Sequence, residues 1–154
     1  MNASFEPFER ELLQILLAGD VEPLPTLRAQ LAAATVAERK YTGVGVFTDF
    51  RLPLGAPKAQ PLNFEVTDVA YELEGAQNGG GVILFVRDGL AETLEVFNYT
   101  DDWPVQPRFT SITYLVPDGP PLPKGGRNLK SSATRDFDDL RRAINEPSRK
   151  GASA

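Results

Sequence analysis

The chain of 154 residues contains no cysteine and no histidine. The absence of cysteine excludes disulfides, zinc–thiolate sites and thiol nucleophiles, and it fits a reducing compartment. Histidine is the side chain whose pKa lies nearest neutrality, so its absence excludes a Ser-His-Asp triad and an imidazole metal site. Carboxylate, lysine, tyrosine and serine chemistry remain open. Composition therefore lowers the expectation of an enzyme.

Long apolar runs are also missing from the chain. No stretch approaches the ~20 apolar residues that span a bilayer, and residues 1–6 lack the basic and apolar regions of a signal peptide. The hydrophobic fraction of 42% and the charged fraction of 24% are typical of soluble globular proteins. We expect a bacterial domain that is cytoplasmic and has no membrane partner.

The charge is divided unevenly along the chain. Residues 1–123 carry 8 Lys and Arg against 17 Asp and Glu, a net charge of −9, and residues 124–154 carry 8 against 4, a net charge of +4. This asymmetry steers encounters with a charged partner. The acidic body would repel phosphate, and acidic residues are interleaved in the basic tail, so nucleic acid is not an expected partner.

Apolar residues recur at helical spacing in the first forty positions. The pattern predicts a helix over residues 5–18, with Ser4 as its N-cap, and a second helix from Pro25 to about Lys40. Two helices joined by a short connector form an antiparallel helical hairpin. The stripe of the first helix consists of Phe5, Phe8, Leu12 and Ile15.

From Tyr41 onwards the apolar period changes to two. Strands are predicted over residues 41–52, 62–73, 82–86, 90–99 and 110–116. Asp88-Gly89 is the dipeptide preferred in a two-residue type I′ turn, which would place Arg87 opposite Leu90 and residue 85 opposite residue 92. Both faces of this hairpin are substantially apolar. The helices would cover one face, and the other needs a loop, the tail or another protein.

Two glycines fall on one face of the strand over residues 41–52. Gly43 and Gly45 weaken a strand interior, and such a pair usually marks the close approach of another element. The pattern fits a helix packed tightly on the sheet. It also fits a bare floor under a ligand or partner.

These helix and strand patterns predict a single α+β domain over residues 1–116. It comprises the N-terminal helical hairpin packed on a mainly antiparallel sheet of four or five strands. Residues 117–133 form a Pro/Gly-rich linker, residues 134–146 an amphipathic helix, and residues 147–154 a disordered tail. A helix this short must dock on its own body or on another chain, so a homodimer through the C-terminal helix is one alternative.

The densest carboxylates near an aromatic side chain follow the predicted hairpin. They are Glu95, Asp101 and Asp102, next to Trp103. Paired carboxylates can bind a divalent cation or act as acid and base, but adjacent strand or turn positions do not converge on one point. Neither a metal, a cofactor nor a catalytic residue is therefore predicted. Two interpretations of residues 101–103 remain. They form either a solvated acidic turn with Trp103 packed in the core, or a protein-binding hot spot in which an aromatic side chain lies within an acidic rim.

Residues 41–50 and 81–104 resemble a group of small bacterial proteins. The shared features are the glycine-rich strand that begins Tyr41-Thr42-Gly43 and a hairpin that is followed by Asp102-Trp103-Pro104. Small acidic α+β proteins of this sort are similar to immunity proteins that neutralise antibacterial toxins. The resemblance covers residues 41–104 and assigns no site residue.

The expected function is therefore non-enzymatic protein binding, as an immunity protein that occludes the active site of its cognate toxin. The predicted partner-binding residues are Asp49, Glu95, Asp101, Asp102 and Trp103. A toxin that acts on nucleic acid would be basic and would suit this acidic domain. The alternative is a small-ligand-binding or self-assembly module in which Gly43 and Gly45 floor a pocket. A carboxylate-based hydrolase ranks last.

Overall fold

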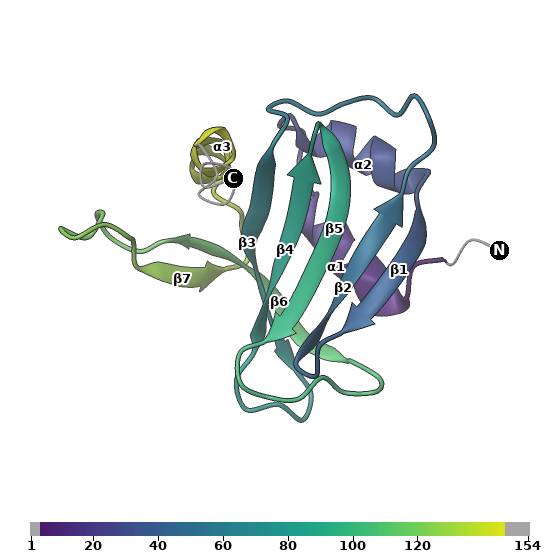
Figure 1. Cartoon of the computed structure of the whole chain (residues 1–154). Helices are drawn as coiled ribbons and strands as arrows, with labels where there is room; N and C mark the ends of the chain where they lie inside the picture. Colours follow the sequence, from purple (N-terminus) through teal and green to yellow (C-terminus); the bar gives the residue numbers. More distant parts are fainter. Residues whose placement is uncertain (1–3, 147–154) are drawn as a thin grey trace.

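The computed structural model describes residues 4–146 as an α+β fold (Figure 1). The described strands form one antiparallel sheet in the order β1-β2-β5-β4-β3-β6-β7. The predicted class is confirmed, although the sheet has seven strands where four or five were expected. In chain order the elements are α1 (Pro7–Leu16), α2 (Leu24–Ala32), β1 (Thr35–Tyr41), β2 (Gly45–Arg51), β3 (Phe64–Leu73), β4 (Gly80–Arg87), β5 (Leu90–Asn98), β6 (Phe109–Pro117), β7 (Leu129–Ser132) and α3 (Phe137–Asn145).

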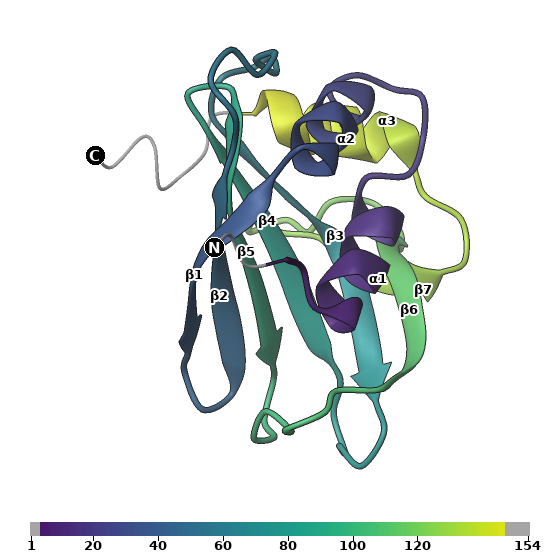
Figure 2. The ribbon, with the colours of Figure 1, turned by 90° about the vertical axis from the view of Figure 1, so that its right-hand side faces the viewer.

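Helices α1 and α2 cover one face of the sheet, which we call the helix face (Figure 2). The opposite face, the open face, carries no helix among residues 4–146. Apolar side chains of β2 to β5 alternate inward and meet the leucines of α1 and α2 to form the core. Those that are at most 1% exposed are Leu12, Leu16, Leu24, Leu27, Val46, Phe64, Val66, Val69, Val82, Leu84, Val86, Leu94 and Val96.

The second helix is shorter than its sequence pattern predicts. It ends at Ala32, and Thr35–Tyr41 form the edge strand β1, which pairs with β2. Extending this helix to Lys40 was therefore wrong. The β-branched pair Thr35-Val36 favours a strand, and Val36 is 5% exposed. Backbone hydrogen bonds to β2 then stabilise this segment as a strand and not as a helix.

A buried carboxylate joins α1 to this edge of the sheet. Glu9 is fully buried and accepts hydrogen bonds from the Arg39 guanidinium at 2.6 and 3.0 Å, from the Thr48 hydroxyl at 2.5 Å and from the Glu6 backbone N–H at 2.7 Å. The hydrogen bond with Glu9 raises the pKa of Arg39 above its usual value. Glu6, rather than the expected Ser4, is the N-cap of α1.

The turn of the β4–β5 hairpin forms as predicted, but its register shifts. Asp88 and Gly89 both have positive φ, as a type I′ turn requires, and Arg87 lies opposite Leu90. A bulge then places residue 85 opposite residue 93, so the predicted pairing with residue 92 was wrong. The extra residue turns Leu94 and Val96 toward the core, which explains the shift.

The range predicted as a linker contains a strand. β6 extends to Pro117, and Leu129–Ser132 form β7, which pairs antiparallel with β6. Four mostly exposed residues give no alternating apolar signal, so β7 depends on its partner strand. Residues 147–154, predicted to be a disordered tail, lie outside the described residues.

Helix α3 packs on its own chain. Leu140 and Ile144 are 4% and 2% exposed, so the stripe that an intermolecular contact would have used is covered. The carboxylate of Asp136 caps α3 by accepting from the Asp139 N–H at 2.9 Å. Arg135, next to the cap, donates to Asp68 of β3 at 2.7 and 2.8 Å and to the Ala18 carbonyl at 3.0 Å. These bonds fix the C-terminal segment against the domain.

Candidate functional site

The structure does not bring the five predicted partner-binding residues together. Asp49 and Glu95 lie on β2 and β5, where the register places both on the open face. Trp103 packs against the core and contacts Phe8 of α1, on the helix side of the sheet. Asp49 and Glu95 therefore lie on the open face, Trp103 packs on the helix face, and Asp101 and Asp102 lie in the loop after β5.

Asp101 and Asp102 hold the loop after β5 in place. The Asp101 carboxylate accepts from the Asn78 backbone N–H at 3.2 Å and from the Thr100 hydroxyl at 3.4 Å, which ties this loop to the loop before β4. The backbone carbonyl of Asp102 accepts from the Asn98 side chain at 3.0 Å. Within residues 4–146, no cluster of three or more acidic side chains is arranged to hold a metal ion.

The two glycines have separate backbone roles. Gly43 lies in the turn between β1 and β2 with φ of +93°, a conformation that suits glycine. At Gly45 an added Cβ would lie 2.0 Å from the backbone oxygen of Val96, so this glycine allows the close approach of β5. The approaching element is a strand, not the helix expected. Neither glycine lines the cavities described below.

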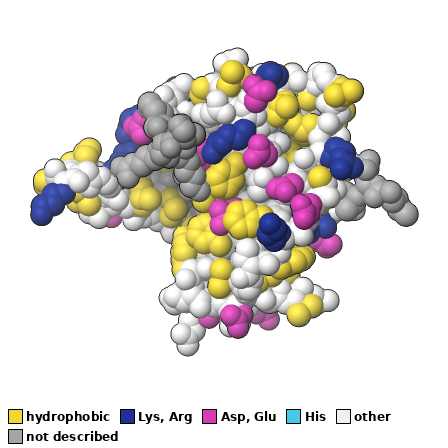
Figure 3. Space-filling view, viewed as in Figure 1, with side chains coloured by type: hydrophobic (Ala, Val, Ile, Leu, Met, Phe, Trp, Pro, Cys, Tyr) yellow, Lys and Arg dark blue, Asp and Glu magenta, His cyan; other side chains and the backbone are white. Residues whose placement is uncertain are grey.

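The open face has a partly exposed apolar centre (Figure 3). The phenylalanine rings come from β2, β4 and β5, and the register places all of them on the side away from α1 and α2. The Phe97 ring packs against Tyr99 with centroids 5.8 Å apart, and the Arg87 guanidinium lies 5.5 Å from the Phe85 ring centroid. The apolar centre consists of Phe47, Ile83, Phe85, Phe97 and Tyr99. Sequence analysis indicated an apolar second face but did not select these residues.

Carboxylates outnumber cations around this apolar centre. Asp49 accepts from the Thr93 hydroxyl at 2.7 Å and lies directly opposite Glu38 of β1, a pairing of like charges. Glu65 pairs with Arg87 at 2.8 Å. A shallow cavity of about 380 Å³ lies between Phe47, Phe85 and Asp49. On strand register, the open face carries Glu38, Asp49, Glu65, Glu72, Glu92 and Glu95 against Lys40, Arg51 and Arg87, a net charge of −3.

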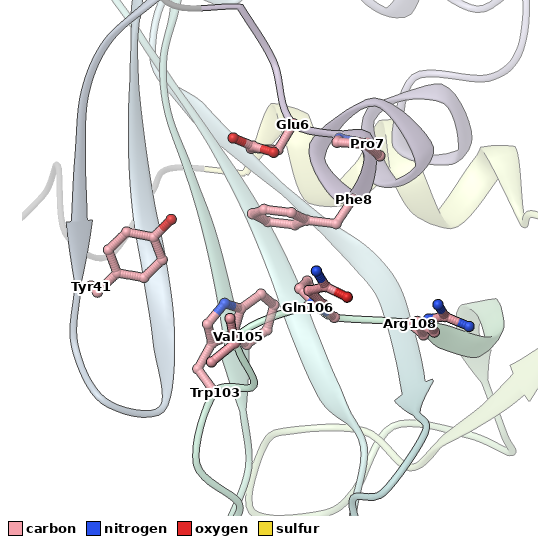
Figure 4. A pocket seen from close by; sticks show the side chains of 9 residues that line it. Glu6, Pro7, Phe8, Tyr41, Trp103, Val105, Gln106 and Arg108 are labelled. Carbon is pink, nitrogen blue, oxygen red and sulfur yellow. The ribbon is translucent and has the colours of Figure 1, made fainter.

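Trp103 lines a second and larger cavity, which we call the Trp103 groove (Figure 4). Its volume is about 540 Å³. The Trp103 ring meets Phe8 edge-on with centroids 5.5 Å apart, and the Trp103 backbone N–H donates to the Gly43 carbonyl at 2.8 Å. The loop after β5 is thus held between α1 and the β1–β2 turn. The groove is lined by Glu6, Pro7, Phe8, Tyr41, Trp103, Val105, Gln106, Pro107 and Arg108.

Comparison with known proteins gives no relative: no protein-family model, curated protein or solved structure matches the chain. The likeness of residues 41–104 to immunity-type proteins stays a prediction. None of the helices in residues 4–146 has the length and apolar character needed to cross a membrane. Both described surfaces place aromatic rings beside carboxylates.

Proposed function

We propose that this protein is a non-enzymatic, acidic protein-binding domain of the cytoplasm that serves as an immunity protein. It binds a basic toxin through the open face of the sheet and occludes the toxin's active site. The observation that carries the proposal is the apolar centre, which no helix of residues 4–146 covers. Carboxylates such as Asp49 lie beside it, and Glu95 lies within it between Phe47 and Ile83. Under this proposal Trp103, Asp101 and Asp102 do not belong to the interface.

The apolar centre supports protein binding because an antiparallel sheet with one solvated face usually presents polar side chains there. Here three phenylalanines lie on adjacent strands: Phe47 on β2, Phe97 on β5 and Phe85 on β4. Clustered aromatic rings that a partner desolvates are typical of binding hot spots. Strands also hold these rings more rigidly than a loop, which reduces the entropy lost on binding.

The charge of the rim supports a basic partner. The open face has a net charge of −3, and the whole chain has a net charge of −5. Like charges directly opposite in a sheet are destabilising, as for Glu38 and Asp49. A lysine or arginine of the partner placed between them would relieve this repulsion. Complementary potentials also speed encounter, which suits an inhibitor that must reach its toxin quickly.

The test compares two charge variants as capture baits in a lysate of the native host. Asp49→Lys/Glu95→Lys reverses two charges on the open face. Asp118→Lys/Glu146→Lys makes the same change at exposed positions beyond β6 and at the end of α3. We expect wild type and the control variant to capture one basic protein that is released at high salt. The open-face variant should capture it about tenfold less or worse.

The captured protein is then expressed in a bacterial host with and without this domain. The proposal expects growth inhibition by the partner alone, restored by wild type and by the control variant but not by Asp49→Lys/Glu95→Lys. Equal capture by both variants would show that the open face is not the interface. A partner that does not inhibit growth would overturn the immunity role.

A further inference from the structure

The Trp103 groove brings together three aromatic rings from distant parts of the chain. Phe8 comes from the first turn of α1, Tyr41 from the end of β1 and Trp103 from the loop after β5. Phe8 is 8% exposed and forms the floor, whereas Tyr41 is 61% exposed and stands across the opening (Figure 4). Its hydroxyl points toward the side where Glu6 and Phe8 lie.

The carboxylate that lines the groove beside these rings is that of Glu6. Arg39 is committed to Glu9 and to the Ser4 carbonyl, the latter at 2.9 Å. Neither Arg39 nor Glu9 lines the groove, whereas Glu6, which also forms the capping box of α1 with Glu9, lines it beside the rings. Arg108, the cation of the lining, lies apart from the rings with Gln106 between them (Figure 4). The aromatic end of the groove is therefore the negative end.

We propose that the Trp103 groove is a second binding site, which takes a basic side chain, arginine or lysine, carried on an extended peptide segment. A cation over the faces of tryptophan and tyrosine is attracted by the ring quadrupoles, and Glu6 supplies the opposite charge. An adjoining cavity of about 290 Å³ shares Pro7, Phe8, Pro107 and Arg108 with the groove. Together they provide length for the backbone on either side of the basic residue.

This site is independent of the proposed toxin interface. The groove lies at the start of α1, on the helix side, whereas the proposed interface is the open face. Substitutions on the open face leave the Trp103 groove unchanged, and the reverse also holds. The toxin-binding proposal and the groove proposal can therefore fail separately.

Trp103 is the single tryptophan of the chain, so its fluorescence reports directly on the groove. The full chain is titrated with N-acetylarginine amide and, as a neutral analogue of the same shape, with N-acetylcitrulline amide. N-acetylglutamate amide serves as the anionic probe. We expect a saturable change with the arginine probe at a Kd of about 1–10 mM. The citrulline probe should bind about fivefold more weakly or not at all.

Two groove variants and one matched control complete the test. Tyr41→Leu and Glu6→Gln should each weaken binding of the arginine probe about two- to fivefold. Tyr99→Leu removes an exposed tyrosine from the open face and should leave the affinity unchanged. Equal binding of arginine and citrulline probes, tighter binding of the anionic probe, or no saturable change up to about 100 mM would each overturn the proposal.

Discussion

Replacing Glu9 by leucine should strongly destabilise the domain. The leucine removes a carboxylate that accepts hydrogen bonds from Arg39, Thr48 and the Glu6 backbone. It leaves the Arg39 guanidinium, whose side chain is 16% exposed, without its counter-charge. The variant therefore breaks the contact that joins α1 to β1 and β2.

The expected size of the effect follows from the burial of this pair. Removing one partner of a buried ion pair costs about 3–5 kcal/mol, because a charge and its donors are left unpaired. A domain of this size has a free energy of unfolding of about 5–15 kcal/mol. Replacing the whole network by apolar residues of similar volume is often neutral. The triple variant Glu9→Leu/Arg39→Met/Thr48→Val should therefore recover most of the loss.

Urea unfolding followed by Trp103 fluorescence measures both variants, since this ring contacts Phe8 next to Glu9. The single variant should unfold at a lower urea midpoint with an unchanged slope, and the triple variant should return close to wild type. A loss below about 1 kcal/mol in the single variant, which is the range of an exposed ion pair, would refute the reasoning. So would a triple variant that is no more stable than the single one.

Three further outcomes are expected. Burial, followed by the charge of Tyr99, raises the pKa of the Tyr71 phenol, so stability should be constant below about pH 10 and fall as the pH rises above it. Tyr71→Phe should make this alkaline decrease smaller when urea midpoints are compared between pH 8 and 11. Gly45→Ala should cost about 1–3 kcal/mol or prevent folding, because its Cβ would meet the β5 backbone, and thermal unfolding would detect this. Arg135→Leu should leave Asp68 unpaired and speed hydrogen exchange of the α3 amides more than that of β4; equal rates in α3 would contradict the role of this ion pair.

The sequence predicted those elements whose signal is local. Asp88-Gly89 defines its turn without help from the rest of the chain, and the spacing of Leu140 and Ile144 marks the buried stripe of α3. β1 was missed because its strand state comes from pairing with β2 and from Arg39 reaching Glu9 of α1. The bulge in β5 was missed for a similar reason, since only the packed core requires Leu94 to point inward.

The candidate surfaces were predictable only in part. Trp103 was singled out beside acidic residues, and its packing against the core was one of the two alternatives considered. Tyr41 was predicted to begin a strand over residues 41–52. Its place at the end of β1, across the groove from Trp103, was not predicted, because residues 35–40 had been assigned to a helix. The apolar open face was anticipated from the alternation in the β4–β5 hairpin. The place of Phe47 beside that hairpin depends on the pairing of β2 with β5, which no local pattern encodes.

The order of strands in the sheet has a consequence for how the chain folds. β1 pairs with β2 locally, and β3, β4 and β5 follow one another as neighbouring hairpins. Only the contact between β2 and β5 joins these two groups within the sheet, and it pairs residue 45 with residue 97. This contact and the pairing of β3 with β6, which joins residue 69 to residue 114, close the long loops of the sheet, and contacts between distant residues slow folding. Both the open face and the Trp103 groove extend across that boundary, so each surface is complete only when the two groups have joined.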